Sequence, residues 1–223
     1  MSESSPVYIG DRLSLEDAIA VGQGAQVALS QQARSGILAA NELVCRQLEQ
    51  KGGRAVYGVN TGFGALAQIR IDETKLKALQ INLIRSHACG VAEALSEEVT
   101  RIMLLLRAQV LALGHSGVRL EVVETLIQML NKGVHPLIPS RGSVGASGDL
   151  APLAHLALVL VGEGEARFKG ETMAGAEAMA KAGIQPIELQ AKEGLSLING
   201  TQAMTAVGII AHARAKSLLT TAN

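Results

Sequence analysis

The chain contains no tryptophan, and only 2% of its 223 residues are aromatic. Its core must therefore be built mainly from aliphatic side chains. Because aromatic residues are so few, one that begins a glycine-rich stretch, as Tyr57 does, is of interest. Basic and acidic residues are equal in number at 20 each, so the chain lacks the basic surplus of a protein that binds nucleic acid or acidic membrane surfaces. We expect neither a nucleic acid nor a membrane as a partner.

Cysteine is scarce as well, because Cys45 and Cys89 are the two present. They cannot form a disulfide framework and lack the spacing of metal ligands, so we expect both to be small buried hydrophobic residues. No metal is expected, since the histidines show no ligand spacing either, and His155, in an apolar helix, is expected to be structural. Residues 1–6 have neither the basic nor the apolar segment of a secretion signal, which favours a reducing cytoplasm.

A long uncharged stretch raises the question of a membrane span. Residues 194–213 carry no formal charge, which approaches the ~20 residues that a spanning helix needs. Asn199, Gly200, Thr201 and Gln202 interrupt this stretch, and polar groups are costly inside a bilayer. A membrane span is therefore not expected.

Signals for helix starts and stops divide the first part of the chain. Ser14 is expected to cap a helix, with Asp17 in the acidic first turn. Further helices are expected over residues 34–51 and 73–89, with a short strand and a glycine-rich loop over residues 54–64. This part of the chain is therefore mixed in structure.

The clearest helix begins after Ser96, with Glu97 and Glu98 at the positive end of its dipole, and Gly114 ends it. Its apolar residues follow a helical spacing at Val99, Ile102, Met103, Leu106, Val110 and Leu113. This stripe does not include Leu104, Leu105 and Leu111, so the helix is apolar nearly all round. The helices expected at residues 153–161 and 203–211 are apolar all round as well. Such helices must be surrounded by protein, and we expect the chain to be too small to cover them, which predicts a large bundle or an oligomer.

These elements predict a mainly α protein with two domains. Residues 1–115 form an N-terminal domain, in which a mixed segment with short strands carries the Tyr57 loop and His87. Residues 116–223 form the start of a central helical bundle with long apolar helices, and carry a second glycine-rich loop.

The second loop is the most informative part of the sequence. It reads Ser-Arg-Gly-Ser-Val-Gly-Ala-Ser-Gly-Asp from Ser140 to Asp149. Neither phosphate-binding glycine pattern is present here, because no Gly-Lys-Ser/Thr follows and no Gly-x-Gly-x-x-Gly succeeds a strand. What remains is the Ser147 hydroxyl, which lies between Ala146 and Gly148, a glycine whose backbone is free to bend sharply. Asp149 is expected to cap the next helix.

Four segments together resemble the aromatic amino acid ammonia-lyases, and most of all their histidine-specific members. They are Ala146-Ser147-Gly148, the Tyr-Gly-Val-Asn-Thr-Gly-Phe-Gly that begins at Tyr57, Ser86-His87, and the Asn-Gly-Thr-Gln that begins at Asn199. The resemblance extends from about residue 18 to the end of the chain. The triplet is far more specific than a lone glycine pattern.

The resemblance implies a prosthetic group made from the chain itself. The Gly148 nitrogen would attack the Ala146 carbonyl carbon, and two dehydrations would leave 4-methylidene-imidazole-5-one (MIO) carrying the former Ser147 β-carbon. Asp149 would promote this cyclisation. The implied reaction is the non-oxidative elimination of ammonia from L-histidine, giving trans-urocanate, the first step of histidine degradation.

The resemblance also implies roles for three further residues, each of which has a plainer interpretation. Tyr57 would face the prosthetic ring and assist in acid–base chemistry, although a tyrosine before such a loop is more often a core residue. His87 would contact the substrate imidazole, although a lone histidine is usually structural. Asn199 would contact the ring or the amino acid head, although Asn-Gly is also a strong turn signal.

Two alternatives remain open. The chain could act on tyrosine or phenylalanine as a lyase or aminomutase of the same family, or be a non-catalytic helical fragment. The resemblance further implies a protein roughly twice this long that forms a homotetramer. The 223 residues would then be its N-terminal portion, and inactive when isolated.

Overall fold

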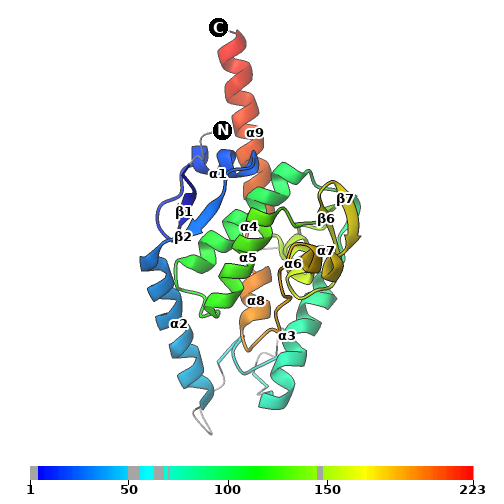
Figure 1. Ribbon diagram of the computed structural model, residues 1–223. Coiled ribbons are helices and arrows are strands. Elements are labelled where there is room, and N and C mark those ends of the chain that lie inside the picture. The colour runs from blue at the N-terminus through cyan, green and yellow to red at the C-terminus, as the bar shows by residue number, and fades with distance from the viewer. Residues whose placement is uncertain (1–4, 50–55, 63–67, 70, 145–147, 223) are drawn as a thin grey trace.

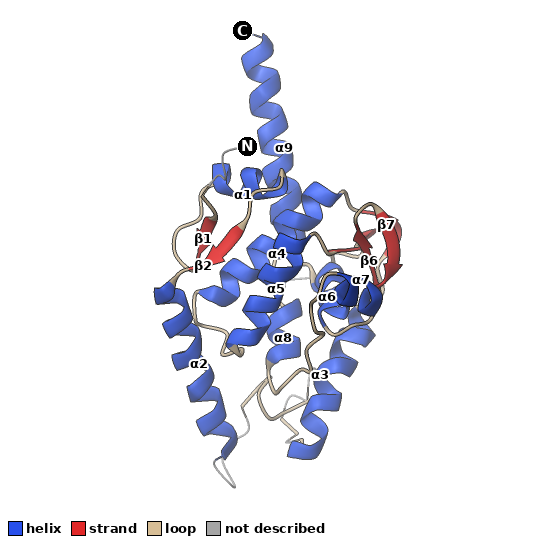
Figure 2. Ribbon diagram, in the orientation of Figure 1, coloured by secondary structure: helices blue, strands red, loops and turns tan. Residues whose placement is uncertain are grey.

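The protein is mainly α-helical, as the sequence predicts, with short strands at its edges (Figures 1 and 2). The computed structural model describes residues 5–49, 56–62, 68–69, 71–144 and 148–222. The predicted Ala146 and Ser147 lie outside these described residues.

The N-terminal segment is a parallel pair of strands joined by a helix. Strand β1 (Val7–Ile9) pairs with β2 (Val27–Leu29), and α1 (Leu15–Gly22) connects them. Ser14 caps α1 as predicted, because its hydroxyl accepts a hydrogen bond from the Asp17 backbone N–H at 3.0 Å. The Asp17 side chain returns a bond to the Ser14 backbone, which completes a capping box.

Two long helices border the lower half of the molecule in Figure 1. Helix α2 (Gln31–Glu49) begins three residues before the predicted start at residue 34, and α3 (Glu73–His87) ends two residues before the predicted end at residue 89. Of the described residues 56–62 between them, 57–60 form a turn and Thr61 forms a β-bridge, as expected for the loop part of this segment. Residues 54 and 55 lie outside the described part of the chain.

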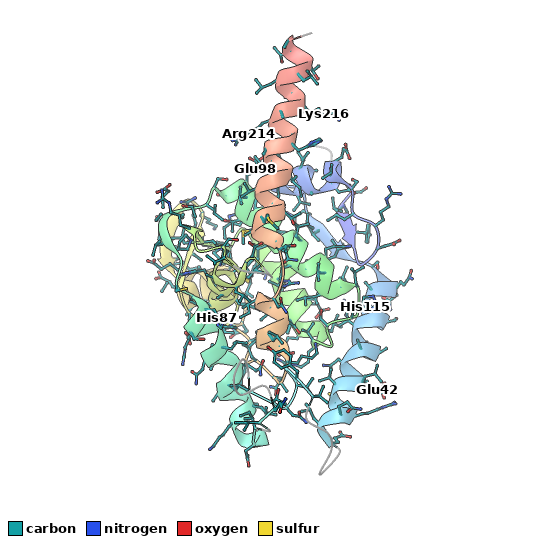
Figure 3. The ribbon with its side chains drawn as sticks, turned by 180° about the vertical axis from the view of Figure 1, so that it is seen from behind. Glu42, His87, Glu98, His115, Arg214 and Lys216 are labelled. Carbon is teal, nitrogen blue, oxygen red and sulfur yellow. The ribbon has the colours of Figure 1, made fainter. Side chains whose placement is uncertain are left out.

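Helices α4 (Glu97–Ala112) and α5 (Leu120–Lys132) pack together at the centre of the protein. Helix α4 also contacts α1, α2 and α9 (Gln202–Ala222). The Ser96 hydroxyl caps α4 as predicted, by accepting from the Val99 backbone N–H at 3.3 Å. Figure 3 shows the α4–α9 packing from behind, with Arg214 of α9 and Glu98 of α4 both labelled.

The predicted apolar stripe of α4 is only partly its buried face. Leu104, Leu105 and Leu111, which fall off that stripe, are at most 1% exposed, whereas Val110 and Leu113 on the stripe are 37% and 44% exposed. Neighbours on several sides bury twelve of the 16 residues of α4. A single stripe therefore describes this helix poorly, because it has no continuous solvent face.

Two further small sheets join the helices in the described part of the chain. Strand β3 (Val91–Ala94) pairs antiparallel with β5 (Pro139–Arg141). Strands β4 (His135–Pro136), β6 (Glu165–Phe168) and β7 (Glu171–Ala174) form an antiparallel sheet in the order β4-β6-β7. This sheet lies beside α6 (Leu150–Leu160) and α7 (Gly175–Lys181).

The expectation that the chain is too small to cover its apolar helices is wrong for two of the three. Eight of the 11 residues of α6 are buried within this chain, as is most of α4. Helix α9 differs, because its residues beyond Ile210 are mainly exposed and it projects from the body in Figure 1.

Helix α8 (Glu193–Ile198) and α9 together span the uncharged stretch noted in the sequence. By length and composition alone, Glu193–Ala222 could cross a membrane, but half of its most apolar window is buried inside the protein. The two helices are also separated by Asn199, Gly200 and Thr201, which are not helical.

One hydrophobic core extends from Ile9 to Ile210 and includes residues on both sides of the predicted domain boundary at 115/116. The division into domains itself stays a prediction. The two cysteines correct the sequence analysis, because Cys45 and Cys89 are both exposed rather than buried. Cys45 lies on α2 and Cys89 follows the end of α3, where neither faces the core.

Because Leu104 is fully buried and Leu113 is 44% exposed, their truncations should differ in cost. Leu104→Ala should lower the free energy of unfolding by about 2–5 kcal/mol, since it removes buried methyl groups and leaves a cavity. Leu113→Ala, the matched control, should cost less than about 1 kcal/mol. Urea unfolding followed by circular dichroism measures both, and equal costs would contradict the burial described here.

Candidate active site

The glycine-rich loop enters α6 through Gly148, which has a φ of +86°. This left-handed conformation favours glycine, since a side chain there would be strained. The Ser143 hydroxyl lies 2.8 Å from the Gly148 carbonyl oxygen and 2.7 Å from Asp149 Oδ1. A single hydroxyl therefore ties the loop to both residues that follow the predicted reactive serine.

Asp149 occupies the N-cap position of α6, but its side chain does not cap that helix. It is fully buried, and its Oδ2 accepts a hydrogen bond from the Met204 backbone N–H at 3.0 Å. Met204 lies in the first turn of α9, so the carboxylate serves the N-terminus of a different helix, where negative charge is favourable. Asp149 therefore lies at the predicted N-cap position of α6, but its side chain binds α9 and not α6.

The Asn199–Thr201 break between α8 and α9 packs directly against Gly148 and Asp149. The Asp149 backbone N–H donates to the Gly200 carbonyl oxygen at 3.3 Å, and a Cβ placed on Gly148 would lie 3.9 Å from Thr201 Cγ2. Asn199 ends α8 with an exposed side chain. The turn interpretation of Asn-Gly is thus confirmed, and the turn brings Asn199 beside the glycine-rich loop.

Arg107 of α4 binds the Asn199–Thr201 break on the side opposite to Asp149. Its Nη1 donates to the Asn199 carbonyl oxygen at 2.9 Å and lies 3.5 Å from that of Leu197. The side chain is 2% exposed, and burial lowers the pKa of Arg107 to about 10. The motifs in the sequence did not point to Arg107. Its positive charge within an otherwise apolar helix was the signal that could have identified it.

The Tyr57 loop is ordered by its own polar side chains. Asn60 Oδ1 accepts from the Val56 backbone N–H at 2.7 Å, and Thr61 Oγ1 accepts from that of Gly58 at 3.3 Å. A Cβ placed on Gly58 would lie 2.5 Å from Leu195 Cδ2, so the loop packs tightly against α8. Tyr57 itself is 56% exposed, which is unlike a core tyrosine and leaves its ring accessible.

His87 is the last residue of α3, and Figure 3 labels it. Its Nδ1 lies 2.8 Å from the Leu83 carbonyl oxygen. Because a carbonyl can only accept, Nδ1 must carry the proton, which leaves Nε2 as the acceptor nitrogen of the neutral ring. The backbone of α3 thereby fixes both the tautomer and the orientation of a half-buried imidazole.

His155 connects the end of α3 to α6. Its Nε2 accepts from the Gly90 backbone N–H at 3.1 Å, and burial lowers the pKa of this imidazole below its ordinary value. The structural role expected for His155 is therefore confirmed. This bond ties the segment that follows His87 to the helix that follows Gly148.

An ion pair anchors the other end of α8. Glu193 is 1% exposed, and its Oε1 and Oε2 accept from Arg119 Nε and Nη2 at 2.9 and 3.0 Å. The bond to Glu193 raises the pKa of Arg119. Sequence reasoning missed this pair, because the two residues are 74 positions apart and neither lies in a motif.

The structure thus joins Asp149 to Gly200, next to Asn199, by a backbone hydrogen bond. The Tyr57 loop reaches α8 through Gly58 and Leu195, and the segment after His87 reaches α6 through the bond from Gly90 to His155. Among the residues that the structure describes, no group of three or more His, Cys, Asp or Glu side chains could hold a metal ion. The site is built from backbone amides, one buried carboxylate and one buried guanidinium.

Comparisons with known proteins identify the family. Residues 13–223 match the family described as aromatic amino acid lyase, and the chain belongs to this family. Curated relatives include histidine ammonia-lyases from Shouchella clausii, 54% identical over 95% of this chain and 42% of that protein, and from Geobacillus thermodenitrificans, 61% identical over 74% and 33%. The chain therefore spans well under half the length of these relatives.

Solved structures of the same family share the fold. A phenylalanine aminomutase from Pantoea agglomerans superposes with a TM-score of 0.89 at 36% identity, over 98% of this chain and 42% of that chain. A histidine ammonia-lyase from Trypanosoma cruzi gives 0.87 at 40% identity, over 96% and 41%. The mainly α fold and the family resemblance are thus confirmed.

The bond from Gly90 to His155 predicts a local pH dependence. A protonated imidazole cannot accept this bond, and the pKa of His155 is lower in the folded protein than its ordinary value of 6.5. The stabilisation is therefore complete above pH 6.5 and is lost as the pH falls through the lower folded-state pKa. Protection of the Gly90 amide from hydrogen exchange should therefore fall as the pH is lowered below 6.5, after correction for the intrinsic rate.

The matched variant is His155→Gln, whose side-chain oxygen can still accept from Gly90. It should keep the protection and lose the pH dependence. A pH dependence that persists in this variant would show that another group is responsible.

Proposed function

We propose that this chain is the N-terminal portion of a cytoplasmic histidine ammonia-lyase that converts L-histidine to trans-urocanate and ammonia. The observation that carries the proposal is the hydrogen bond from the Asp149 backbone N–H to the Gly200 carbonyl oxygen. It joins the residue that follows the family triplet to the residue that follows Asn199. The names of the curated relatives, at 54% and 61% identity, support histidine as the substrate.

The described residues fit a prosthetic ring made from Ala146, Ser147 and Gly148. Gly148 already has a sharply bent backbone, and a Cβ placed on it would make an ordinary contact with Thr201 Cγ2 at 3.9 Å. The ring would lie next to the N-terminus of α6, whose partial positive charge favours a group that accepts electrons. The buried Asp149 carboxylate, one residue away, can take up a proton during cyclisation and would promote it.

The methylidene-imidazolone, once formed, supplies the electrophilic carbon that protein side chains lack. In the elimination, a proton leaves the substrate β-carbon and the carbon–nitrogen bond breaks to release ammonia, so no oxidant is required. Tyr57 would assist this proton transfer from its accessible position on the loop. The Asn199 side-chain amide would bind the amino acid head, and His87 Nε2 would accept a hydrogen bond from the substrate imidazole.

Several segments must therefore be held at fixed distances for catalysis. The chain spans 42% of the Shouchella clausii relative, so a complete site would draw on residues beyond these 223. We propose that the whole protein is a homotetramer and that the isolated chain is inactive.

A second candidate is an aminomutase or lyase acting on phenylalanine or tyrosine. The superposition on the Pantoea agglomerans phenylalanine aminomutase favours it, with a TM-score of 0.89. Histidine is the better supported substrate, because the Ser86-His87 pair places an imidazole with a fixed tautomer at the end of α3.

The first test of the proposal is the mass of the peptide Ser140–His155 from purified protein. Cyclisation should lower this mass by two molecules of water, confined to the triplet. Ser147→Ala lacks the hydroxyl whose loss creates the methylidene carbon, and should abolish the full deficit. An unmodified mass in a protein of the relatives' full length would favour the non-catalytic alternative.

The second test concerns His87 and uses a chimera in which this chain replaces the matching part of the Shouchella clausii relative. His87→Phe should lower kcat/KM for histidine by about 10- to 100-fold, since it removes one hydrogen bond to the substrate. The control is His212→Phe on the exposed part of α9, which should leave turnover unchanged. An unchanged substrate preference in the His87 variant would favour the second candidate.

A further inference from the structure

Arg107 is a buried cation that binds only backbone carbonyls among its described contacts. The side chain is 2% exposed, and its Nη1 bonds to Asn199 and Leu197 at the C-terminal end of α8. Burial alone lowers its pKa, with no carboxylate acting against that effect. A charge this deeply buried is costly unless it is compensated, and here the compensation comes from the carbonyl end of a helix.

Asp149 is the counterpart of Arg107 on the other side of the same break. Its carboxylate accepts from Met204 at the N–H end of α9, while its own backbone N–H donates to the Gly200 carbonyl oxygen. The two buried charges therefore face opposite helix ends, with Asn199, Gly200 and Thr201 between them. Each charge has the sign that its helix end favours.

Gly200 makes the two sides of the break interdependent. A Cβ placed on it would lie 3.0 Å from Arg107 Nη1 and within contact of the Gln202 side chain. Its carbonyl oxygen accepts from Asp149, so the Arg107 side of the break cannot shift without moving the backbone of Asp149. The Gln202 Oε1 atom, also buried here, has no hydrogen-bond partner in the described structure.

We propose that Arg107 is a positioning residue of the candidate site. It holds the Asn199 backbone so that the Asn199 side chain faces the substrate, and through Gly200 it holds the Gly148–Asp149 backbone in the conformation that cyclisation requires. This role rests on the proposed function, because it serves the residues that cyclise and bind substrate. This positioning role is distinct from a contribution to the overall stability of the fold, which every buried arginine of α4 makes.

Arg101 is a matched control on the same helix. It is 7% exposed, and its guanidinium donates to the carbonyl oxygens of Val21, Ala25 and Leu130 at 2.8, 3.3 and 3.2 Å. These partners lie in and around α1 and at the end of α5, away from the break. Arg101→Met therefore removes a buried guanidinium of equal charge without touching the Asn199–Thr201 segment.

The experiment compares hydrogen exchange in the wild-type chain, Arg107→Met and Arg101→Met. Arg107→Met should speed exchange over residues 199–205 by about 10- to 100-fold, the usual cost of losing a buried charged hydrogen bond. Arg101→Met should leave this segment protected and speed exchange near Ala25. Equal exchange over residues 199–205 in the two variants would overturn the proposal.

Arg107→Lys provides a second measurement should the methionine variant fail to fold. A lysine at this depth loses its proton far more readily than arginine, within a range of roughly pH 7–10. Protection over residues 199–205 should then fall with rising pH in this variant, while in wild type it should stay constant up to about pH 9, below the Arg107 pKa of about 10. Wild-type protection in the lysine variant at a pH above about 10, where the buried ammonium group has lost its proton, would contradict a role for the positive charge.

The mass of the Ser140–His155 peptide separates the failure of this inference from that of the proposed function. Arg107→Met should lower the fraction of peptide that lacks two waters by at least about tenfold, while Arg101→Met retains it. A wild-type deficit that is equally present in both variants overturns the positioning role and leaves the lyase proposal intact. A wild type with no deficit in a protein of the relatives' full length contradicts the proposed function and the link to cyclisation, and the exchange data then decide whether Arg107 holds the break.

Discussion

The break between α8 and α9 lies between two buried charges, and the geometry of the candidate site depends on this arrangement. Arg107 meets the carbonyl end of α8, and Asp149 meets the N–H end of α9. A continuous helix through Asn199 and Gly200 would use these carbonyls and N–H groups internally and leave both charges uncompensated in the core. The charges therefore favour a break here, and the break presents Asn199 next to Gly148.

Helix α4 shows how an apolar helix can also specify the placement of its neighbours. Hydrophobic burial stabilises α4 strongly but without direction, because one leucine contact resembles another. The polar side chains on the helix supply the direction. Arg101 binds carbonyl oxygens of the α1 region, Gln109 accepts from the Gly10 backbone N–H at 2.9 Å, and Arg107 binds the end of α8. Each such bond sets the position of one segment against the central helix.

The similarity to solved lyases and aminomutases shows that this scaffold carries more than one chemistry. Fold alone therefore cannot assign the reaction, and the assignment must come from particular side chains. His87 is the informative one, because the Leu83 carbonyl oxygen fixes its tautomer and leaves a defined acceptor nitrogen. In the proposed function, this acceptor would bind a substrate ring N–H, which a plain phenyl ring lacks.

Local signals in the sequence determined the helix starts at Ser14 and Ser96, the mainly α class, and the motif residues from Tyr57 to Asn199. Such features depend on neighbours within a few positions, so a single sequence is sufficient to predict them. Only the tertiary structure decided which sides of α4 are buried, that Cys45 and Cys89 are exposed, and that Asp149 binds the first turn of α9. It also revealed Arg107, because the cost of burying a charge is offset by carbonyls some 90 residues away, which no local pattern encodes.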